Sequence, residues 1–298
     1  MLAKLLRILI ATQVLLGAAV GWGVATWQGW PVWTAIIFAA ALPFTVMVLV
    51  DTYSGVVSRG KEPWAAWLKS LTGEYRAGFT VFLFRQPWTT LAPNLLSAAG
   101  TVKRIPVVLV HGYMCNHRIW DDMANALREQ GHDVFAVNLE PLFASIDKYA
   151  PILEAAVQAL LRHSGQSKVA IVGHSMGGLA SRAWLRTYGP HHVARIITLG
   201  TPHAGTQIPQ HRPTANGRQM AWASEWLQQL QATETAETRQ LFRIAITPQD
   251  NIVYPQRAQT LPDVTATVFE GIGHVQMCLD PRVISWVQHE LSNLPSGA

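Results

Sequence analysis

Ser175 stands at the centre of the run Gly-His-Ser-Met-Gly at residues 173–177. A short apolar run rich in β-branched residues, 169–172, precedes it, and residues 176–188 have the spacing of a helix. On such a tight turn from strand to helix, a serine hydroxyl projects at the carboxyl edge of the sheet. Side chains two residues before and two residues after the serine would collide, so glycine is expected at both positions. The pattern and its context together predict that Ser175 is a nucleophile.

The side chains that would activate Ser175 are predicted from chain order. A serine hydroxyl needs a base, and in this arrangement an acidic residue and then a histidine follow the nucleophile. Among the eleven histidines, His274 comes just after the last predicted strand, on a glycine-bearing loop. Asp250 comes just beyond the preceding strand, whereas Asp263 is typical of a turn and Asp280 follows the histidine. Asp250 and His274 are therefore the predicted acid and base.

Two backbone amides are needed to stabilise the oxyanion that forms when a serine attacks an ester. One amide is expected from Met176, the residue after the nucleophile. The other is expected from the loop after the first strand, with Tyr113 as the first choice and Met114 as the second. The side chain of His111 is expected to hold this loop by hydrogen bonds and to take no part in catalysis.

The elements that would position these residues begin near residue 105. Short apolar runs alternate from there with segments of helical spacing. Strands are predicted at 106–110, 134–137, 169–172, 195–199, 241–246 and 265–269, and helices at 120–130, 148–163, 176–188 and 281–291. Alternating strands and helices indicate an α/β fold, with a mostly parallel sheet of about six strands and helices on both faces.

The first 52 residues are predicted to form a transmembrane helical hairpin. Residues 8–27 and 33–50 are apolar runs without a charged residue, and each approaches the roughly 20 residues that cross a bilayer. Lys4 and Arg7 precede the first run and further basic residues follow the second, so both ends are expected in the cytoplasm, at the inner membrane. The alternative is a cleaved signal peptide followed by a single span.

Residues 53–104 form a predicted amphipathic segment between the hairpin and the catalytic unit. Apolar side chains recur there at helical spacing, and they are Trp64, Trp67, Leu68, Leu71, Tyr75, Phe79 and Phe82. Such a face could lie on the bilayer surface or pack against the domain. The sequence does not choose between these two interpretations.

Charge and cysteine content narrow the classes of function. The net charge is +5, but the Lys and Arg residues are scattered and no nucleic-acid-binding motif occurs, so no nucleic-acid partner is expected. The positive balance is compatible with an anionic membrane surface. Cys115 and Cys278 both follow predicted catalytic loops, and a bond between them is one hypothesis. Two free thiols are the favoured interpretation in a reducing compartment.

The combined motifs resemble those of bacterial lipases and esterases of the α/β-hydrolase superfamily. The resemblance covers about residues 105–291 and rests on five segments: Val-His-Gly-Tyr at 110–113, Gly-His-Ser-Met-Gly-Gly at 173–178, Gly-Thr-Pro-His-Ala-Gly-Thr at 200–206, Asp250, and Gly-His at 273–274. It implies ester hydrolysis through an acyl-enzyme, without a metal ion or an organic cofactor. The catalytic domain is expected at 105–298. The membrane hairpin departs from secreted lipases of this kind.

Residues 203 to about 235 resemble the cap, or lid, of such lipases. With Met114, four residues of this segment are predicted to contact substrate or form the lid: His203, Met220, Trp222 and Trp226. A lid would bind acyl chains or open against a membrane, and the alternative is that the segment only covers the sheet edge.

These observations predict a membrane-anchored serine hydrolase that cleaves lipid-like acyl esters. The alternatives are a thioesterase or acyltransferase with the same Ser, Asp and His residues, or a catalytically silent binding module tethered to the membrane.

Overall fold

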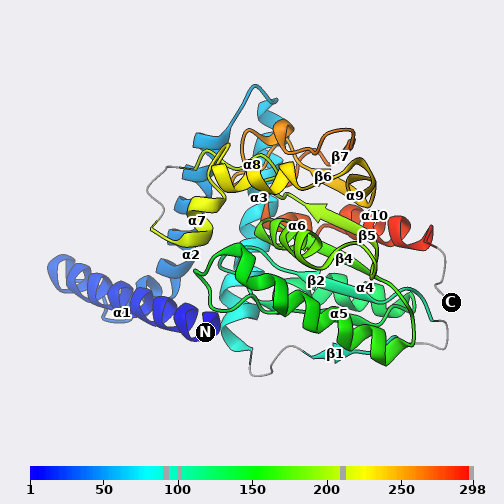
Figure 1. Cartoon of the computed structure of the whole chain (residues 1–298). Helices are drawn as coiled ribbons and strands as arrows, with labels where there is room; N and C mark the ends of the chain where they lie inside the picture. Colours follow the sequence, from blue (N-terminus) through cyan, green and yellow to red (C-terminus); the bar gives the residue numbers. More distant parts are fainter. Residues whose placement is uncertain (90–93, 100–102, 209–212, 295–298) are drawn as a thin grey trace.

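A single seven-stranded sheet forms the centre of the computed structural model, which describes residues 1–89, 94–99, 103–208 and 213–294 (Figure 1). The strands are β1 (Leu95–Leu96), β2 (Val107–Val110), β3 (Val134–Ala136), β4 (Val169–His174), β5 (Val193–Leu199), β6 (Phe242–Ile246) and β7 (Ala266–Val268). Their order across the sheet is β1-β3-β2-β4-β5-β6-β7. Strand β1 pairs antiparallel with β3, and the other neighbours pair in parallel.

The prediction of a mostly parallel α/β sheet is confirmed. Six of the strands match the predicted runs to within a few residues. Most of these runs are buried on both faces and so consist of apolar residues, whereas β7 at the sheet edge is only partly buried. The additional strand, β1, is only two residues long. So short a segment gives no periodic pattern in the sequence.

Helices cover both faces of the sheet. The main ones are α4 (Asp121–Glu129), α5 (Ala150–Ser164), α6 (Met176–Tyr188) and α10 (Pro281–Ser292). Alternate residues of β2 belong to different hydrophobic clusters: Val108 packs in the cluster that contains α5 and α6, and Val107 in the one that contains α4 and α10. This alternation follows from the period of two along a strand. The sheet edge formed by the strands' carboxyl ends is left for loops.

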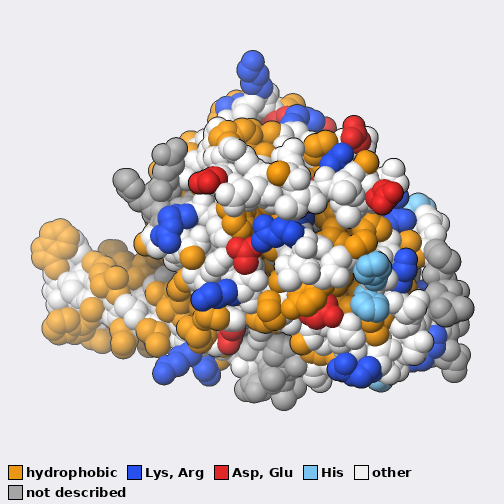
Figure 2. All heavy atoms as spheres, viewed as in Figure 1, with side chains coloured by type: hydrophobic (Ala, Val, Ile, Leu, Met, Phe, Trp, Pro, Cys, Tyr) orange, Lys and Arg blue, Asp and Glu red, His pale blue; other side chains and the backbone are white. Residues whose placement is uncertain are grey.

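The N-terminal residues form two antiparallel helices, α1 (Leu2–Gln28) and α2 (Thr34–Ser58). Both are long and apolar enough to cross a membrane, judged by length and composition. The outer part of the hairpin, where α1 is joined to α2, protrudes from the body as an arm (Figure 1). The side chains of this arm in Figure 2 are mostly hydrophobic, while charged side chains gather on the body. A Cβ on Gly21 of α1 would come within 2.8 Å of the Cα of Ala35, so the two helices pack closely.

The segment after the hairpin folds against both the hairpin and the sheet domain. It contains α3 (Trp64–Gly78), the π-helical η1 (Phe79–Arg85) and the 3-10 turn η2 (Gln86–Trp88). Trp67 is buried and its Nε1 donates to the carbonyl of Gly55 at 3.0 Å, whereas Trp64 and Leu68 are exposed. The apolar face of α3 is therefore divided: Trp67 and Leu71 are buried against protein, whereas Trp64 and Leu68 are open to the surroundings. Helix α2 itself continues beyond residue 52.

Within the described residues, the cap segment contains two short helices, α7 (Ala215–Gln219) and α8 (Glu225–Ala232), and α9 (Ala236–Gln240) follows it. Residues 209–212 of the predicted cap lie outside the described residues, as do 90–93 and 100–102 of the predicted juxtamembrane segment and 295–298 of the predicted catalytic domain. Among the residues that the structure describes, four 3-10 turns lie in the loops of the sheet domain: η3 (His117–Trp120), η4 (Ile146–Tyr149), η5 (Gln256–Ala258) and η6 (Val275–Cys278).

Candidate active site

Ser175 occupies the turn between β4 and α6, as the sequence predicts. Its backbone has φ 54° and ψ −126°, a conformation that few residues other than glycine adopt. A Cβ on Gly173 would lie 2.7 Å from the backbone nitrogen of Gly178, and one on Gly177 would overlap the carbonyl oxygen of Val110. Glycines at these two positions therefore permit the turn. Backbone strain of this kind is typical of functional sites.

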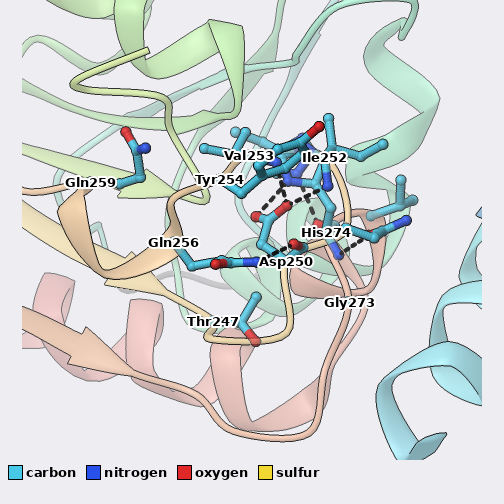
Figure 3. A network of polar contacts seen from close by, with 12 residues as sticks. Thr247, Asp250, Ile252, Val253, Tyr254, Gln256, Gln259, Gly273 and His274 are labelled. Carbon is cyan, nitrogen blue, oxygen red and sulfur yellow. Dashed lines mark hydrogen bonds and ion pairs between the residues drawn. The ribbon is translucent and has the colours of Figure 1, made fainter. Parts of the chain in front are cut away.

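Asp250 and His274 meet although they are 24 residues apart in the sequence. The Nδ1–H of His274 donates to Oδ2 of Asp250 at 2.8 Å (Figure 3). The other oxygen, Oδ1, accepts the amides of Ile252 at 2.8 Å and Val253 at 2.7 Å. Asp250 follows β6 and His274 follows β7, so parallel strands bring both to one edge of the sheet. The carboxylate is thus fixed by the backbone and in turn orients the imidazole.

The electrostatic surroundings of His274 suit a base. Burial alone would lower its pKa, but the nearby carboxylate of Asp250, its hydrogen bond to Nδ1 and the charge of Glu74 together raise the pKa above its ordinary value. With Nδ1 donating to Asp250, the lone pair of the neutral ring is on Nε2. This tautomer can accept a proton from a hydroxyl.

Glu74 of α3 holds the loop that carries His274, and sequence reasoning missed it. Its Oε1 accepts the amide of Val275 at 2.9 Å and its Oε2 accepts the amide of Gln276 at 3.0 Å. Burial raises the pKa of Glu74, although these two hydrogen bonds act in the opposite direction. No local motif could have identified this residue, because its partners lie 201 and 202 positions away.

His174 and Asn251 also support the backbone of His274. Nε2 of His174 donates to the carbonyl of His274 at 3.0 Å, and the two rings lie 4.6 Å apart. Oδ1 of Asn251 accepts the amide of His274 at 3.2 Å. Burial, reinforced by the charge of His274, holds the pKa of His174 well below its usual range. His174 precedes Ser175 and Asn251 follows Asp250 in the sequence, so their place next to predicted site residues was the one indication of a role.

The loop after β2 lies directly against Ser175. A Cβ on Gly112 would come within 2.7 Å of the Cβ of Ser175. His111 holds this loop: its Nε2 accepts the amide of Leu139 at 3.0 Å, and its Nδ1 donates to the carbonyl of Gly112 at 2.8 Å. Burial lowers the pKa of His111 to about 4, so the ring is neutral, as this pair of bonds requires. The loop thereby brings the backbone of Tyr113 close to the serine.

Two cavities meet at Ser175. The first, of about 480 Å³, is called the hairpin cavity because Leu9 and Ile10 of α1 and Val46 and Met47 of α2 line it. The second, of about 300 Å³, is called the cap cavity. Its wall includes Pro202, Thr206, Thr214, Gly217 and Met220. Tyr113, Ser175 and Ile252 line both cavities.

The five residues predicted to contact substrate or form the lid are distributed unevenly. Met114 lines the hairpin cavity and Met220 the cap cavity. In the part of the chain that the structure describes, the other three line neither cavity. His203 is buried and its Nε2 lies 3.0 Å from the hydroxyl of Thr198, and burial holds its pKa well below the usual range. Trp222 is 39% exposed, and Nε1 of Trp226 donates to Oδ2 of Asp147 at 2.9 Å.

Cys115 and Cys278 are both buried and not bonded to each other. Burial raises the pKa of Cys115 to about 12. Burial, and then the nearby Cys115 thiol, raise the pKa of Cys278 well above its ordinary value. The two side chains therefore approach each other as free thiols.

Comparison with known proteins gives a match to one family model, described as alpha/beta hydrolase fold, over residues 105–255. A triacylglycerol lipase of Pseudarthrobacter phenanthrenivorans is 35% identical over 114 residues, which cover 35% of this chain and 35% of that protein. A pimeloyl-[acyl-carrier protein] methyl ester esterase of Vibrio cholerae is 32% identical over 95 residues, covering 32% of this chain and 36% of that protein. The chain thus spans about a third of the length of these curated relatives.

Solved structures extend the likeness at the level of the fold. The mature lipase BlEst2 of Bacillus licheniformis superposes with a TM-score of 0.56 at 19% identity, covering 66% of this chain and 98% of that one. Lipase B of Aspergillus fumigatus superposes with a TM-score of 0.56 at 17% identity, covering 68% of this chain and 57% of that one. The superposition includes nearly all of mature BlEst2 but only two thirds of this chain, so this chain has further segments outside the shared fold.

Proposed function

The chain belongs to the alpha/beta hydrolase fold family, and from this premise we propose that it is a serine hydrolase that cleaves carboxylic esters of lipid-like acyl groups. One observation carries the proposal. A strained Ser175 shares a cavity with His274, whose Nδ1 is held 2.8 Å from a carboxylate of Asp250. Hydrolysis by a serine needs this combination of nucleophile, base and orienting acid.

The first half of the reaction forms an acyl-enzyme. Oγ of Ser175 attacks the ester carbonyl carbon while Nε2 of His274 takes the hydroxyl proton. The amides of Tyr113 and Met176 would donate to the resulting oxyanion. The amide of Met176 suits this task because it starts α6, where the first N–H groups have no acceptor within the helix. When the ester C–O bond breaks, the proton passes from Nε2 to the leaving oxygen, and an alcohol departs.

The second half releases the acid. Water gives a proton to Nε2 of His274 and attacks the acyl carbon, and the bond to Ser175 breaks as Oγ recovers that proton. The net reaction consumes one ester and one water and yields one carboxylic acid and one alcohol. Asp250 remains ionised throughout and stabilises the imidazolium that forms twice.

Apolar cavities support lipid-like substrates. The cap cavity shares three residues with the hairpin cavity, and the rest of its wall is mainly apolar. Met220 is one of these apolar side chains. Met114 and Met220 are the two predicted contact residues that retain this role in the proposal. Methionine side chains adapt well to irregular apolar ligands.

The hairpin of α1 and α2 is proposed as a membrane anchor. Large apolar side chains on it are open to the surroundings, with Trp27 81% and Ile36 70% exposed, which is unfavourable in water. Lys4 and Arg7 precede the first span and basic residues follow the second, which supports an inner-membrane protein with its catalytic domain in the cytoplasm. Alkaline phosphatase fused after residue 60 or at the C-terminus is expected to be inactive, and activity of either fusion would refute this orientation.

The catalytic assignment is tested by Ser175→Ala in the full-length protein. We expect it to lose nearly all turnover of p-nitrophenyl butyrate and all labelling by a fluorophosphonate probe. Ser292→Ala, at the exposed end of α10, is the matched control and should keep both. Unchanged hydrolysis or labelling in Ser175→Ala would refute the assignment.

A further inference from the structure

Ser175 lines two cavities, and an ester bound to it has two halves to place. After attack, the carbonyl carbon is bonded to Oγ of Ser175, and the acyl chain and the leaving oxygen extend from it in different directions. His274 must protonate the leaving oxygen, so this oxygen has to lie on the side of the serine where His274 lies. His274 lines the hairpin cavity. Among the described residues that line the cap cavity, His274 does not occur.

We propose that the hairpin cavity binds the leaving alcohol of the substrate and the cap cavity binds its acyl chain. This inference rests on the proposed ester hydrolysis and adds to it which half of the substrate each cavity receives. Protonation by His274 then occurs at the mouth of the hairpin cavity. The carbonyl carbon sits where the cavities meet, beside Tyr113 and Ile252, which line both.

The wall of the hairpin cavity indicates what kind of alcohol fits. Leu9, Ile10, Val46, Met47 and Val50 line it, and all five belong to the two charge-free apolar runs of the hairpin. The cavity therefore lies where the spans enter the body, at the surface of the proposed membrane. An alcohol with a long hydrocarbon chain can leave its tail among bilayer lipids while its oxygen reaches His274. A water-soluble alcohol would gain nothing from such a wall.

The polar side chains on the same wall offer no partner for an anionic alcohol. Asp51 and Glu74 line the hairpin cavity, and Oδ2 of Asp51 is buried without a hydrogen-bond partner among the described residues. Among the described residues no Lys or Arg lines this cavity, so a phosphate group would lose its hydration there without gaining a cationic partner. A neutral hydroxyl, such as the free hydroxyl of a glyceride, could donate to Asp51. The inferred substrate class is thus a neutral long-chain ester of the glyceride type, drawn from the bilayer.

Filling each cavity in turn tests the assignment. The full-length protein is assayed in detergent with two ester series. One series has a butyryl group and alcohols from ethyl to hexadecyl, and the other has p-nitrophenol and acyl groups from butyryl to palmitoyl. Val46→Trp should lower the hexadecyl-to-ethyl ratio of kcat/KM about tenfold and leave the palmitoyl-to-butyryl ratio unchanged. Met220→Trp should do the reverse.

Matched variants control for the added indole. Leu49→Trp changes a neighbouring position of α2 whose side chain is 63% exposed, and it should alter neither ratio. Ile10→Trp with its control Ile8→Trp repeats the test from α1, in case Val46→Trp folds poorly. Ratios within one variant do not depend on the fraction of protein that is folded.

The outcomes are distinct. A lower palmitoyl-to-butyryl ratio in Val46→Trp or Ile10→Trp would overturn the assignment, and so would unchanged ratios in both. Vesicles of ether-linked phospholipid should release fatty acid faster with dioleoylglycerol than with diacyl phosphatidylglycerol, and the opposite order would overturn the preference for neutral alcohols. Lack of hydrolysis of every ester by the unmodified protein would instead refute the proposed function itself.

Discussion

Glu74 connects the helix after the hairpin to the loop of the proposed catalytic base, so Glu74→Gln tests whether the N-terminal segment is part of the active site. The carboxyl group accepts two amides, those of Val275 and Gln276. A glutamine keeps one oxygen acceptor and turns an NH₂ group toward the other amide. One buried N–H then loses its partner, which costs about 1–3 kcal/mol. For a chain of this size the expected fall in Tm is about 2–10 °C.

The same substitution should shift the pH profile of activity. His274 must be neutral to accept a proton, so kcat/KM rises as the pH passes upward through its pKa. Glu74 is one of the groups that raise this pKa. Its removal therefore lowers the pKa of His274, and the acidic limb of the kcat/KM profile moves to lower pH. The measurement is kcat/KM for p-nitrophenyl butyrate between about pH 5 and 9, which spans the ordinary histidine pKa.

Glu62→Gln is the matched control. Glu62 also lies in the N-terminal segment and contacts the sheet domain, through Arg257 at 2.9 Å, but that arginine side chain is 57% exposed. An exposed ion pair contributes only about 0–1 kcal/mol, so Tm should change little and the acidic limb should stay in place. A pH profile of Glu74→Gln that matches the unmodified protein, with a lower Tm, would show that Glu74 only stabilises the fold.

Two further predictions concern the site and its thiols. Asp250→Asn keeps an oxygen for the two backbone amides but presents an NH₂ group to Nδ1 of His274, which forces the ring proton to Nε2. In steady-state assays kcat should therefore fall by about 10⁴, with little change in Tm. A loss of kcat under tenfold would contradict the role of Asp250. Burial raises the pKa values of Cys115 and Cys278, so a disulfide reagent that labels thiols by exchange should react with neither of them at pH 8 in the native protein. After unfolding without reductant, the same reagent should react with both. Absence of titratable thiols in the unfolded, unreduced protein would indicate a disulfide.

The sequence was most informative where a local cause determines the local structure. The turn at Ser175 needs glycines on both sides for steric reasons that lie within a few residues, so its geometry could be predicted. The order of strands in a parallel sheet brings their carboxyl ends together, which made the meeting of Asp250 and His274 predictable. Helices α1 and α2 were predictable because long apolar runs need no knowledge of their neighbours.

Side-chain partners far apart in the chain were not predictable. Trp226 is a large apolar residue of the kind expected in a lid, yet its indole donates to Asp147, 79 positions away, and faces the body. His203 follows a strand near the site, but Thr198 and burial hold it beneath the surface. Periodicity gives the apolar face of a helix and says nothing of the element on which that face packs.

The amino-acid sequence by itself determined a serine at a strained turn, an acid and a histidine in the order of this fold, and two apolar helices ahead of them. Only the tertiary structure decided that these two parts form one site. It places the base of the hairpin on the wall of the cavity that Ser175 also lines, and it attaches Glu74 to the loop of His274. The physical reason is that docking of the hairpin and α3 depends on surface complementarity between segments about 200 residues apart, such as Ser54 and Asn251, at a 197-residue separation. No short pattern in the chain encodes such a contact.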